Sequence, residues 1–492
     1  MNINYTKNIF GSNDDLKLIL LPIAKNDSLS NVITSIANDY NFSAEIITNE
    51  FKAEAKEQFS FFTKNVKIVL LGLGQNPIFI DVQNIFRSYV FQNKHKVPSN
   101  IGVNFNYSLA NFTNLIEAAV NGMLLGRYAI GLYKSETTNN FLFNSSEASI
   151  TIISDNEQVA KNQAEQADKI ANTQLKIYDL VNNPSNKKTP KHLAQVAQNS
   201  GKEFGYDVKV FDKHDCIDQK FDALLSVNKG SPEEPVMIVM EYKPESAKTS
   251  LGLVGKGVTF DTGGISIKPS TNMHYMKSDM GGAAAVIGAI ELIAKLKLPV
   301  HVVAVVPSTE NCVDGNSIKP GDVINSYLGK TIEVIDTDAE GRLILSDALA
   351  FLAKNYTVDS IIDFATLTGS CLRTFGYICS GLFSNDDQLA ENLFKAGEAC
   401  GERMWRLPIW DAYSDDLKSD IADLRNFSGK PSAGAISAAK FLEVFVNGHT
   451  SWAHLDIAGT AFSDSEFASQ KIPTAYGIRL IFEYLQQLLK TK

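Results

Sequence analysis

Four carboxylates lie on glycine-punctuated turns between residues 255 and 342, each beside an expected strand or helix. They are Asp261, Asp279, Asp338 and Glu340. In an open α/β sheet, ligands bind beyond the carboxyl ends of the strands, where turns from distant parts of the chain meet. This stretch therefore favours an α/β fold in which one edge of a sheet collects the four acids.

Acids gathered in this way need positive charge close by. Without it, mutual repulsion would leave most of them protonated at neutral pH. Two divalent cations roughly 3.5–4 Å apart would neutralise them and form a well-attested hydrolytic device. Oxygen donors suit manganese or magnesium, and zinc also accepts aspartate and glutamate. Lys256 and Lys268 lie in the same apolar, glycine-rich setting, where an unpaired lysine would be costly to bury.

Each acid also has a purely structural interpretation when it is taken alone. Asp261 could form a turn before Gly263-Gly264, and Asp279 could cap the helix that follows it. Asp338 and Glu340 alternate about a turn that ends an expected strand, so both can point the same way, with Arg342 on the same side by a spacing of two. Their structural interpretation is a charged turn before the helix that begins at Leu343. The joint pattern, rather than any one residue, indicates the metal site.

Strand and helix patterns alternate in the first third of the chain. The apolar strand runs are 16–24, 67–72 and 148–154, and helical periodicity covers 29–40 and 109–126. Such alternation predicts parallel strands covered by helices. We therefore expect a smaller N-terminal α/β domain at 1–154.

A polar, alanine-rich segment at 155–175 predicts a helix that connects two domains, with a surface helix inside one continuous domain as the alternative. Thr189-Pro190 then starts another helix, with threonine as its cap and proline at its first position. Residues 176–492 predict a larger catalytic α/β domain with a central mixed, mostly parallel sheet. Its expected strands are 207–211, 235–242, 251–254, 300–306, 331–335, 360–364 and 452–457, and its clearest helices are 281–297 and 343–354.

Charge and composition limit the partners and the compartment. The 492 residues include 46 basic and 55 acidic side chains, a formal net charge of −9, whereas nucleic-acid binding rests on basic patches. Five scattered cysteines, none in a CxxC pair, fit a reducing compartment. The longest apolar stretch, 281–296, is shorter than the roughly 20 residues that a membrane span needs. Because no secretory signal is visible either, we expect a cytoplasmic protein that binds neither membrane nor nucleic acid.

Several motifs in this chain resemble the signatures of the cytosolic leucyl aminopeptidase family, in the family's order and spacing. The longest are VGKGVTFDTGGISIKP at 254–269, MKSDMGGAAAV at 276–286 and TDAEGRL at 337–343. Shorter ones are KPGDV at 319–323, TLTG at 366–369, WRLP at 405–408 and WAHLDIAGT at 452–460. The resemblance covers about residue 179 to the end, and the N-terminal unit only by architecture. It implies a di-metal exopeptidase.

The resemblance implies a role for each residue of the cluster. Metal ligands would be Lys256, Asp261, Asp279, Asp338 and Glu340, with Asp261 and Glu340 bridging. Lys268 would polarise the scissile carbonyl and stabilise the oxyanion. Arg342 would hold a bicarbonate ion as the proton shuttle for a hydroxide activated by two metal ions, Mn or Zn with Mg possible. Met276, Thr366, Leu367 and Gly369 would line the pocket for the first side chain of the substrate.

The implied activity is release of N-terminal amino acids from peptides, with leucine preferred and broad tolerance. The free α-amino group of the substrate would bind one cation, which would fix its first residue at the site. The resemblance also implies a homohexamer of two stacked trimers. Two alternatives remain: a two-metal phosphoesterase, which shares the ligand chemistry, and a DNA-binding architectural protein, which the acidic charge disfavours.

Two residues depart from the family pattern, and one candidate is set aside. Asp336 stands where the family usually has asparagine, and Thr262 stands where serine is common, but neither change removes a ligand. His454 lies in an apolar strand and is expected to be a hydrogen-bonded core histidine. A helix-borne zinc protease and a serine hydrolase are disfavoured, because HExxH and GxSxG motifs do not occur.

Overall fold

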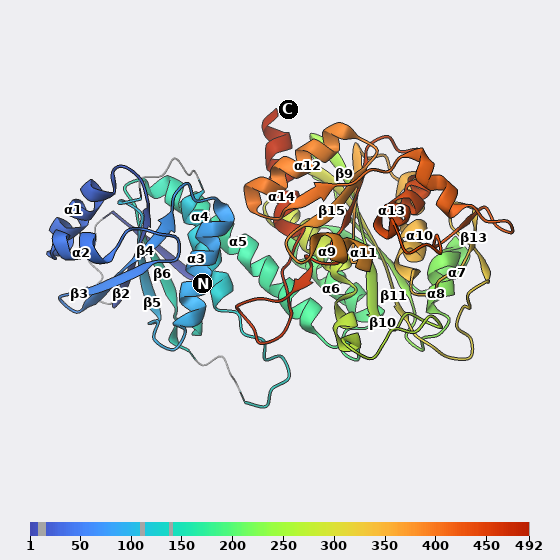
Figure 1. Cartoon of the computed structure of the whole chain (residues 1–492), viewed down its shortest axis with the longest axis horizontal. Helices are drawn as coiled ribbons and strands as arrows, with labels where there is room; N and C mark the ends of the chain where they lie inside the picture. Colours follow the sequence, from blue (N-terminus) through green and yellow to red (C-terminus); the bar gives the residue numbers. More distant parts are fainter. Residues whose placement is uncertain (8–15, 109–113, 137–140, 492) are drawn as a thin grey trace. The chain divides into compact units, whose positions relative to one another are not determined.

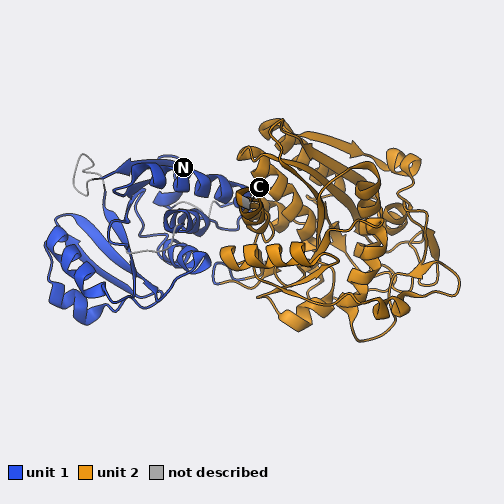
Figure 2. Ribbon diagram, turned by 90° about the horizontal axis from the view of Figure 1, so that it is seen from above, with its two compact units in different colours: residues 1–175, 466–469 blue, residues 176–465, 470–492 orange. Residues whose placement is uncertain are grey.

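The computed structural model describes residues 1–7, 16–108, 114–136 and 141–491, and Figure 1 labels many of its elements. Contacts divide the chain into two compact units, 1–175 with 466–469 and 176–465 with 470–492 (Figure 2). Each unit combines a sheet with helices, which confirms the expected α/β fold class. The helix α5 (Glu157–Asn182) belongs partly to each unit and extends beyond its expected end. The domain boundaries at 154 and 176 stay predictions.

The first unit is built on a six-stranded sheet in the order β1-β6-β5-β2-β4-β3. Its strands are β1 (Asn2–Thr6), β2 (Leu18–Ala24), β3 (Gln58–Thr63), β4 (Val66–Gly74), β5 (Asn100–Asn104) and β6 (Ser149–Ile153). Its helices are α1 (Leu29–Tyr40), α2 (Ala44–Glu50), α3 (Phe79–Gln92), α4 (Leu115–Gly126) and the short η1 (Leu142–Asn144). All strand pairs are parallel except β3 with β4. The expected strands and the helix at 29–40 are confirmed, whereas positions 109–113 of the other expected helix lie outside the described residues.

The second unit contains a nine-stranded mixed sheet in the order β16-β15-β18-β14-β9-β11-β8-β7, with β10 beside β11. Its strands are β7 (Asp207–Phe211), β8 (Val236–Tyr242), β9 (Thr249–Gly255), β10 (Gly257–Asp261), β11 (Val300–Asn311), β14 (Ser360–Ala365), β15 (Ser380–Ser384), β16 (Met404–Arg406) and β18 (Trp452–Asp456). Five of the pairings are parallel and three are antiparallel. The expected mostly parallel sheet is therefore confirmed.

Helices and two small sheets complete this unit. The helices are α6 (Pro190–Phe204), α7 (Lys213–Gln219), α8 (Asp222–Asn228), η2 (Met273–Ser278), α9 (Gly281–Lys295), α10 (Glu340–Asn355), α11 (Gly369–Phe375), α12 (Asp387–Cys400), η3 (Asp411–Leu417), α13 (Gly434–Glu443), η4 (Val444–Val446) and α14 (Ile478–Thr491). The small sheets are β12 (Val323–Asn325) with β13 (Thr331–Glu333) and β17 (Leu424–Arg425), and β19 (Phe462–Ser463) with β20 (Ile472–Pro473). Thr189 caps α6 as expected, because its side chain accepts a hydrogen bond from the His192 N–H. No described helix is both long and apolar enough to cross a membrane.

Two glycines of β9 lie where helices pack closely against the sheet. A Cβ at Gly252 of β9 would meet Leu352 of α10, and a Cβ at Gly255 would meet Gly282 of α9. Positions separated by three along a strand face opposite sides, so α9 and α10 cover opposite faces of the sheet. Both helices begin beside the carboxyl end of β9, because Gly282 in the first turn of α9 packs against Gly255, and Gly341 in the first turn of α10 packs against Lys256. This arrangement brings the acidic turns to one edge.

Candidate metal centre and active site

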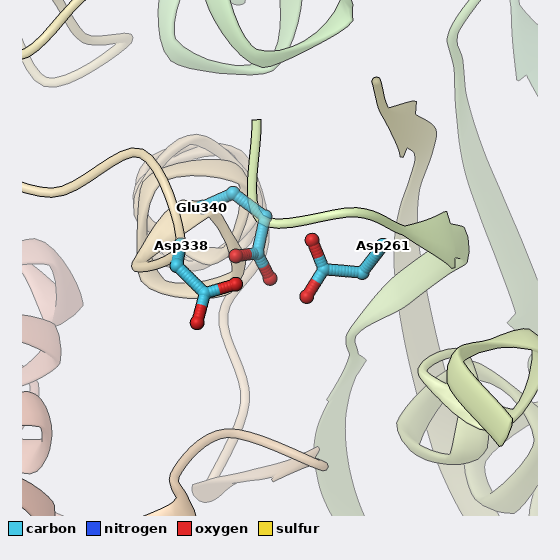
Figure 3. Close-up of side chains that lie close together, drawn as sticks. All are labelled: Asp261, Asp338 and Glu340. Carbon is cyan, nitrogen blue, oxygen red and sulfur yellow. The ribbon is translucent and has the colours of Figure 1, made fainter. Parts of the chain in front are cut away.

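Three of the four expected acids meet where the end of β10 lies near the start of α10. Asp261 is the last residue of β10, Glu340 is the first residue of α10, and Asp338 precedes that helix. Each offers a carboxylate oxygen, and these oxygens lie within 4.8 Å of one another. Figure 3 shows the three carboxylates turned toward a common space. Asp261 and Glu340 are buried, whereas the Asp338 side chain is 36% exposed.

The turn that follows Asp261 needs glycine. Gly263 and Gly264 have φ values of +87° and +66°, a region that side chains with a Cβ rarely adopt. The Gly263 N–H donates to Oδ1 of Asp261 at 2.9 Å, so Asp261 also forms the turn that was expected of it alone. The other oxygen of Asp261 remains directed to Lys268.

Two lysines lie among the acids. Nζ of Lys256 is 2.8 Å from Oδ2 of Asp279 and 2.8 Å from Oε1 of Glu340, and it donates to the Thr366 carbonyl at 3.0 Å. Nζ of Lys268 is 2.7 Å from Oδ2 of Asp261 and also pairs with Asp338. Asp279 therefore joins the site through Lys256. All the metal-ligand candidates of the sequence are brought together.

The pKa values report crowding of negative charge. Burial, together with Asp261 and Glu340, raises the pKa of Asp338 to about 7. Burial is also the main cause of the raised pKa of Asp279 and Glu340. Burial alone would lower the pKa of Lys256, but Asp279, Glu340 and Asp261 outweigh it and raise that pKa. The acids thus resist ionisation while the lysine keeps its proton, which is the condition that added cations would relieve.

The residues present fit divalent ions. The donor set is dominated by hard carboxylate oxygens, which magnesium and manganese prefer and zinc accepts. Oε2 of Glu340 is buried and accepts no hydrogen bond from any residue in the described part of the chain. Leaving such an oxygen without a partner is costly. A cation at this position would satisfy it.

Metal affinity is expected to rise as the pH increases through about 7. Asp338 holds a proton below its pKa of about 7, and that proton must leave before the carboxylate binds a cation. Because the folded pKa lies above the usual value of 3.8, the metal-free protein should also lose stability as the pH rises from about 4 to 7. Calorimetric Mn²⁺ titrations in buffers of different ionisation enthalpy would measure the proton release. Affinity that does not vary between pH 6 and 8, with no proton release, would contradict this expectation.

Two expectations about the acidic turns were wrong. Asp279 does not cap α9, because the cap position is Met280 and Oδ1 of Asp279 instead accepts from the Thr366 hydroxyl at 2.7 Å. Glu340 and Arg342 do not share a side by a spacing of two. They lie in the first turn of α10, where that spacing separates them by roughly 200° around the axis. The helix begins three residues before its expected start.

Arg342 is buried behind the acids. One of its terminal nitrogens, Nη1, donates to the Asn426 carbonyl at 2.7 Å, and its Nε has no partner among the described residues. Burial lowers the pKa of Arg342 to about 10, partly offset by Glu340 and Asp336. The side chain therefore stays charged at neutral pH and has a donor to spare.

The expected pocket residues flank the acids on two loops. Met276 lies half-buried in η2, and Thr366 contacts both Lys256 and Asp279. Leu367 is partly buried against the core between the sheet and α10. Gly369, the first residue of α11, is exposed.

Four further residues that position the site were missed. Asn311, Thr337, Asn426 and Asp456 are all buried polar side chains. Asn311 donates to Oδ1 of Asp261 at 2.8 Å and to the Thr337 carbonyl at 3.0 Å. The Asn426 amide joins the segment 335–339 through four contacts. Asp456 accepts from the backbone of Leu367 and Thr368, which holds the pocket loop.

His454 behaves as expected of a core histidine. Its Nδ1 lies 2.6 Å from Oδ1 of Asp363, and the Trp452 indole donates to the other oxygen of that carboxylate at 2.7 Å. All three side chains are buried. His454 supports the sheet and contributes no ligand to the acid cluster.

The α/β fold and the acid cluster are the features expected of a metal-dependent hydrolase. Residues 177–482 match the "Cytosol aminopeptidase family, catalytic domain". A probable cytosol aminopeptidase of Chloroherpeton thalassium is 40% identical over 515 residues, which cover 99% of each chain. A probable cytosol aminopeptidase of Chlorobaculum parvum is 52% identical over 309 residues, 63% of this chain and 61% of the relative. The chain belongs to the cytosol aminopeptidase family and is a metalloaminopeptidase.

Solved structures agree with this family. The structure titled "Bottromycin maturation enzyme BotP in complex with Mn" has a TM-score of 0.84 at 28% identity, covering 96% of this chain and 99% of its own. Cytosol aminopeptidase from Coxiella burnetii has a TM-score of 0.81 at 30% identity, covering 98% and 99%. The similarity therefore extends over both units, including the N-terminal unit that the sequence motifs did not reach.

Proposed function

We propose that this enzyme removes the N-terminal amino acid from peptides, with leucine-like side chains preferred and a broad tolerance. The observation that carries the proposal is the interleaving of two lysines with four carboxylates in one cluster, most of which is buried. A two-metal phosphoesterase would use the same acids, but family membership favours peptides. A DNA-binding role is disfavoured by the net charge of −9.

The proposed ligands of two divalent ions are Lys256, Asp261, Asp279, Asp338 and Glu340. Manganese or zinc is favoured and magnesium is possible, and the solved neighbour in complex with Mn supports a divalent cation. When bound, these ions would lower the pKa of a water molecule and polarise the peptide carbonyl. Lys256 must release its proton to act as a ligand. Asp279, Glu340 and Asp261 raise the pKa of Lys256, so in the metal-free protein the amine keeps its proton.

The proposed catalytic residues are Lys268 and Arg342. Lys268 is tethered to Asp261 and Asp338 with about a fifth of its side chain exposed, so its ammonium group can face a substrate oxygen while remaining charged. Its pKa is raised because Asp261, Glu340 and Asp338 outweigh the effect of burial. It would therefore stabilise an oxyanion as a cation rather than act as a base.

Arg342 offers an anion site next to the acids. Its buried Nε, which has no partner among the described residues, could donate to a bicarbonate ion that accepts and returns protons. The backbone of Gly341 and the pocket loop lie in the same region, because Lys256 crosses over Gly341 to reach the Thr366 carbonyl. Bicarbonate binding is a proposal that follows from the family resemblance and this free donor.

The specificity pocket is proposed to lie between two segments, η2 and the loop 366–369. Met276 supplies a flexible apolar wall, which suits leucine-like side chains and adapts to others. Thr366, Leu367 and Gly369 form the opposite segment, where backbone contacts would tolerate side chains of different sizes. We expect the enzyme to be cytoplasmic and hexameric, and both statements stay predictions.

A matched pair of substrates tests the proposal. Leucyl-anilide should be cleaved after Mn²⁺ is restored to chelated enzyme, whereas N-acetyl-leucyl-anilide should not be cleaved measurably. The acetyl group removes the basic amine that anchors the first residue. Equal rates for the two substrates would refute amine anchoring, and a phosphodiester cleaved faster than either would favour the phosphoesterase.

A further inference from the structure

Lys188 is a buried amine that the proposed mechanism does not use. Its side chain is fully buried, and its Nζ donates to the carbonyl oxygens of Val181 at 2.9 Å and Lys277 at 2.7 Å. No carboxylate within the described ranges lies at ion-pair distance from it. Burial and the nearby charge of Lys277 lower the pKa of Lys188 well below its usual value. Burying an amine whose partners are all carbonyl oxygens is costly. The link that Lys188 makes between two segments must offset that cost.

Lys188 joins the end of α5 to η2. Val181 and Asn182 form the last turn of α5, where backbone carbonyls lack partners within the helix. The Lys188 amine donates a hydrogen bond to the Val181 carbonyl, and Nζ of Lys277 donates one to the Asn182 carbonyl at 2.9 Å. The two lysines also face the negative end of the helix dipole. We call these two links, made by Lys188 and Lys277, the lysine clamp.

The clamp holds the segment that carries two proposed site residues. Lys277 follows Met276 directly and precedes Asp279 by two positions. The Asp279 N–H donates to the Met276 carbonyl at 3.2 Å, and the Ser278 hydroxyl donates to the Tyr275 carbonyl at 2.7 Å, so the segment is internally braced. The hydrogen-bond geometry of a 3₁₀ helix is poorer than that of an α-helix, and runs as long as the six residues of η2 are uncommon. Its position therefore depends on contacts from outside, of which the clamp supplies two.

We propose that Lys188 is a positioning residue that fixes Asp279 for metal binding and Met276 for substrate binding, by fastening η2 to the end of α5. This inference rests on the proposed roles of Asp279 and Met276. Lys188 acts through the Lys277 carbonyl and touches neither metal nor substrate. Asp279 has to meet Lys256 and Thr366 at the same time, so a small shift of η2 would disturb both contacts.

The test replaces Lys188 with methionine, which keeps the length of the side chain and removes both hydrogen bonds. The Lys188→Met enzyme should bind Mn²⁺ about tenfold more weakly, in the range known for residues that orient metal ligands. At saturating Mn²⁺, kcat should return toward the wild-type value while KM for leucyl-anilide stays raised, because Met276 remains displaced. A loss of stability alone would not produce this separation of KM from kcat.

Two further variants keep the result decisive. Lys191→Met is the matched control, since Lys191 lies three residues further along the chain, in the first turn of α6, where it is exposed and paired with Glu234, and it should behave as wild type. Lys277→Met removes one link of the clamp and should weaken Mn²⁺ binding by a smaller factor. A folded Lys188→Met enzyme with wild-type Mn²⁺ affinity and KM would overturn the inference. If Lys188→Met does not fold, unchanged Mn²⁺ affinity in Lys277→Met would overturn it. Inactivity of the wild type and of Lys191→Met would instead count against the proposed function.

Discussion

Replacing Lys268 with alanine is expected to lower kcat for leucyl-anilide by roughly 10²–10³-fold, the cost of removing one oxyanion donor. Lys268 remains charged because three carboxylates raise its pKa, so it is available to a developing oxyanion. KM should change much less than kcat, since the amine of the substrate is anchored elsewhere. Steady-state kinetics at saturating Mn²⁺ would measure both constants.

The control for this prediction is Lys395→Ala. Lys395 is an exposed lysine on α12 that pairs with Glu391 and lies outside the acid cluster. It should retain wild-type kcat. If Lys268→Ala kept more than half of the wild-type kcat with full metal occupancy, Lys268 would have no role in the chemical step.

Replacing Asp261 with asparagine is expected to remove metal-dependent activity, with Mn²⁺ affinity falling by more than about 10²-fold. Loss of residues that merely orient metal ligands already costs about 10–100-fold, and Asp261 is itself a proposed bridging ligand. Oδ1 of an asparagine could still accept from Asn311 and Gly263, so the turn should survive. Isothermal titration with Mn²⁺ would measure the affinity.

Asp261→Asn should also remove most of the thermal stabilisation that Mn²⁺ gives the wild type. A cation that binds only the folded protein stabilises it, and the variant is expected to bind Mn²⁺ weakly. Thermal unfolding with and without Mn²⁺ would show a clear rise in Tm for the wild type and little rise for the variant. Asp322→Asn, at a partly exposed acid near Lys319, is the matched control. Wild-type Mn²⁺ affinity in Asp261→Asn would remove Asp261 from the ligand set.

Local sequence patterns predicted most of the fold, because the strand and helix preferences of these segments agree with the conformations that they adopt in the folded chain. The apolar run before Ala24 and the Thr189-Pro190 cap both form what they predict. The start of α10 was placed too late, since Glu340 and Gly341 look like turn residues when read without the rest of the site. Gly341 is needed there for space rather than for a turn, because a Cβ at this position would meet the Lys256 side chain.

The candidate site was predicted in part. The acids and lysines could be found because several of the same residue types recur on glycine turns beside strand ends. Asn311 and Asn426 could not be found in this way, because a neutral amide in a loop or at a strand end has many uses. Their roles arise only from pairings across 50 and 90 residues of chain, with Asp261 and Asp336. The role of Lys188 was not predicted either, because its partners are backbone carbonyls, which every residue has.

The most direct test of the central claim is a Mn²⁺ titration of rigorously metal-free enzyme, with bound ions counted while leucyl-anilide hydrolysis is followed in the same samples. The acid cluster predicts two ions per chain, and turnover that appears only as these sites fill. Full turnover by a chain shown to hold no metal would contradict the claim that these carboxylates act by sharing cations. So would a titration to high Mn²⁺ concentration in which no ion binds.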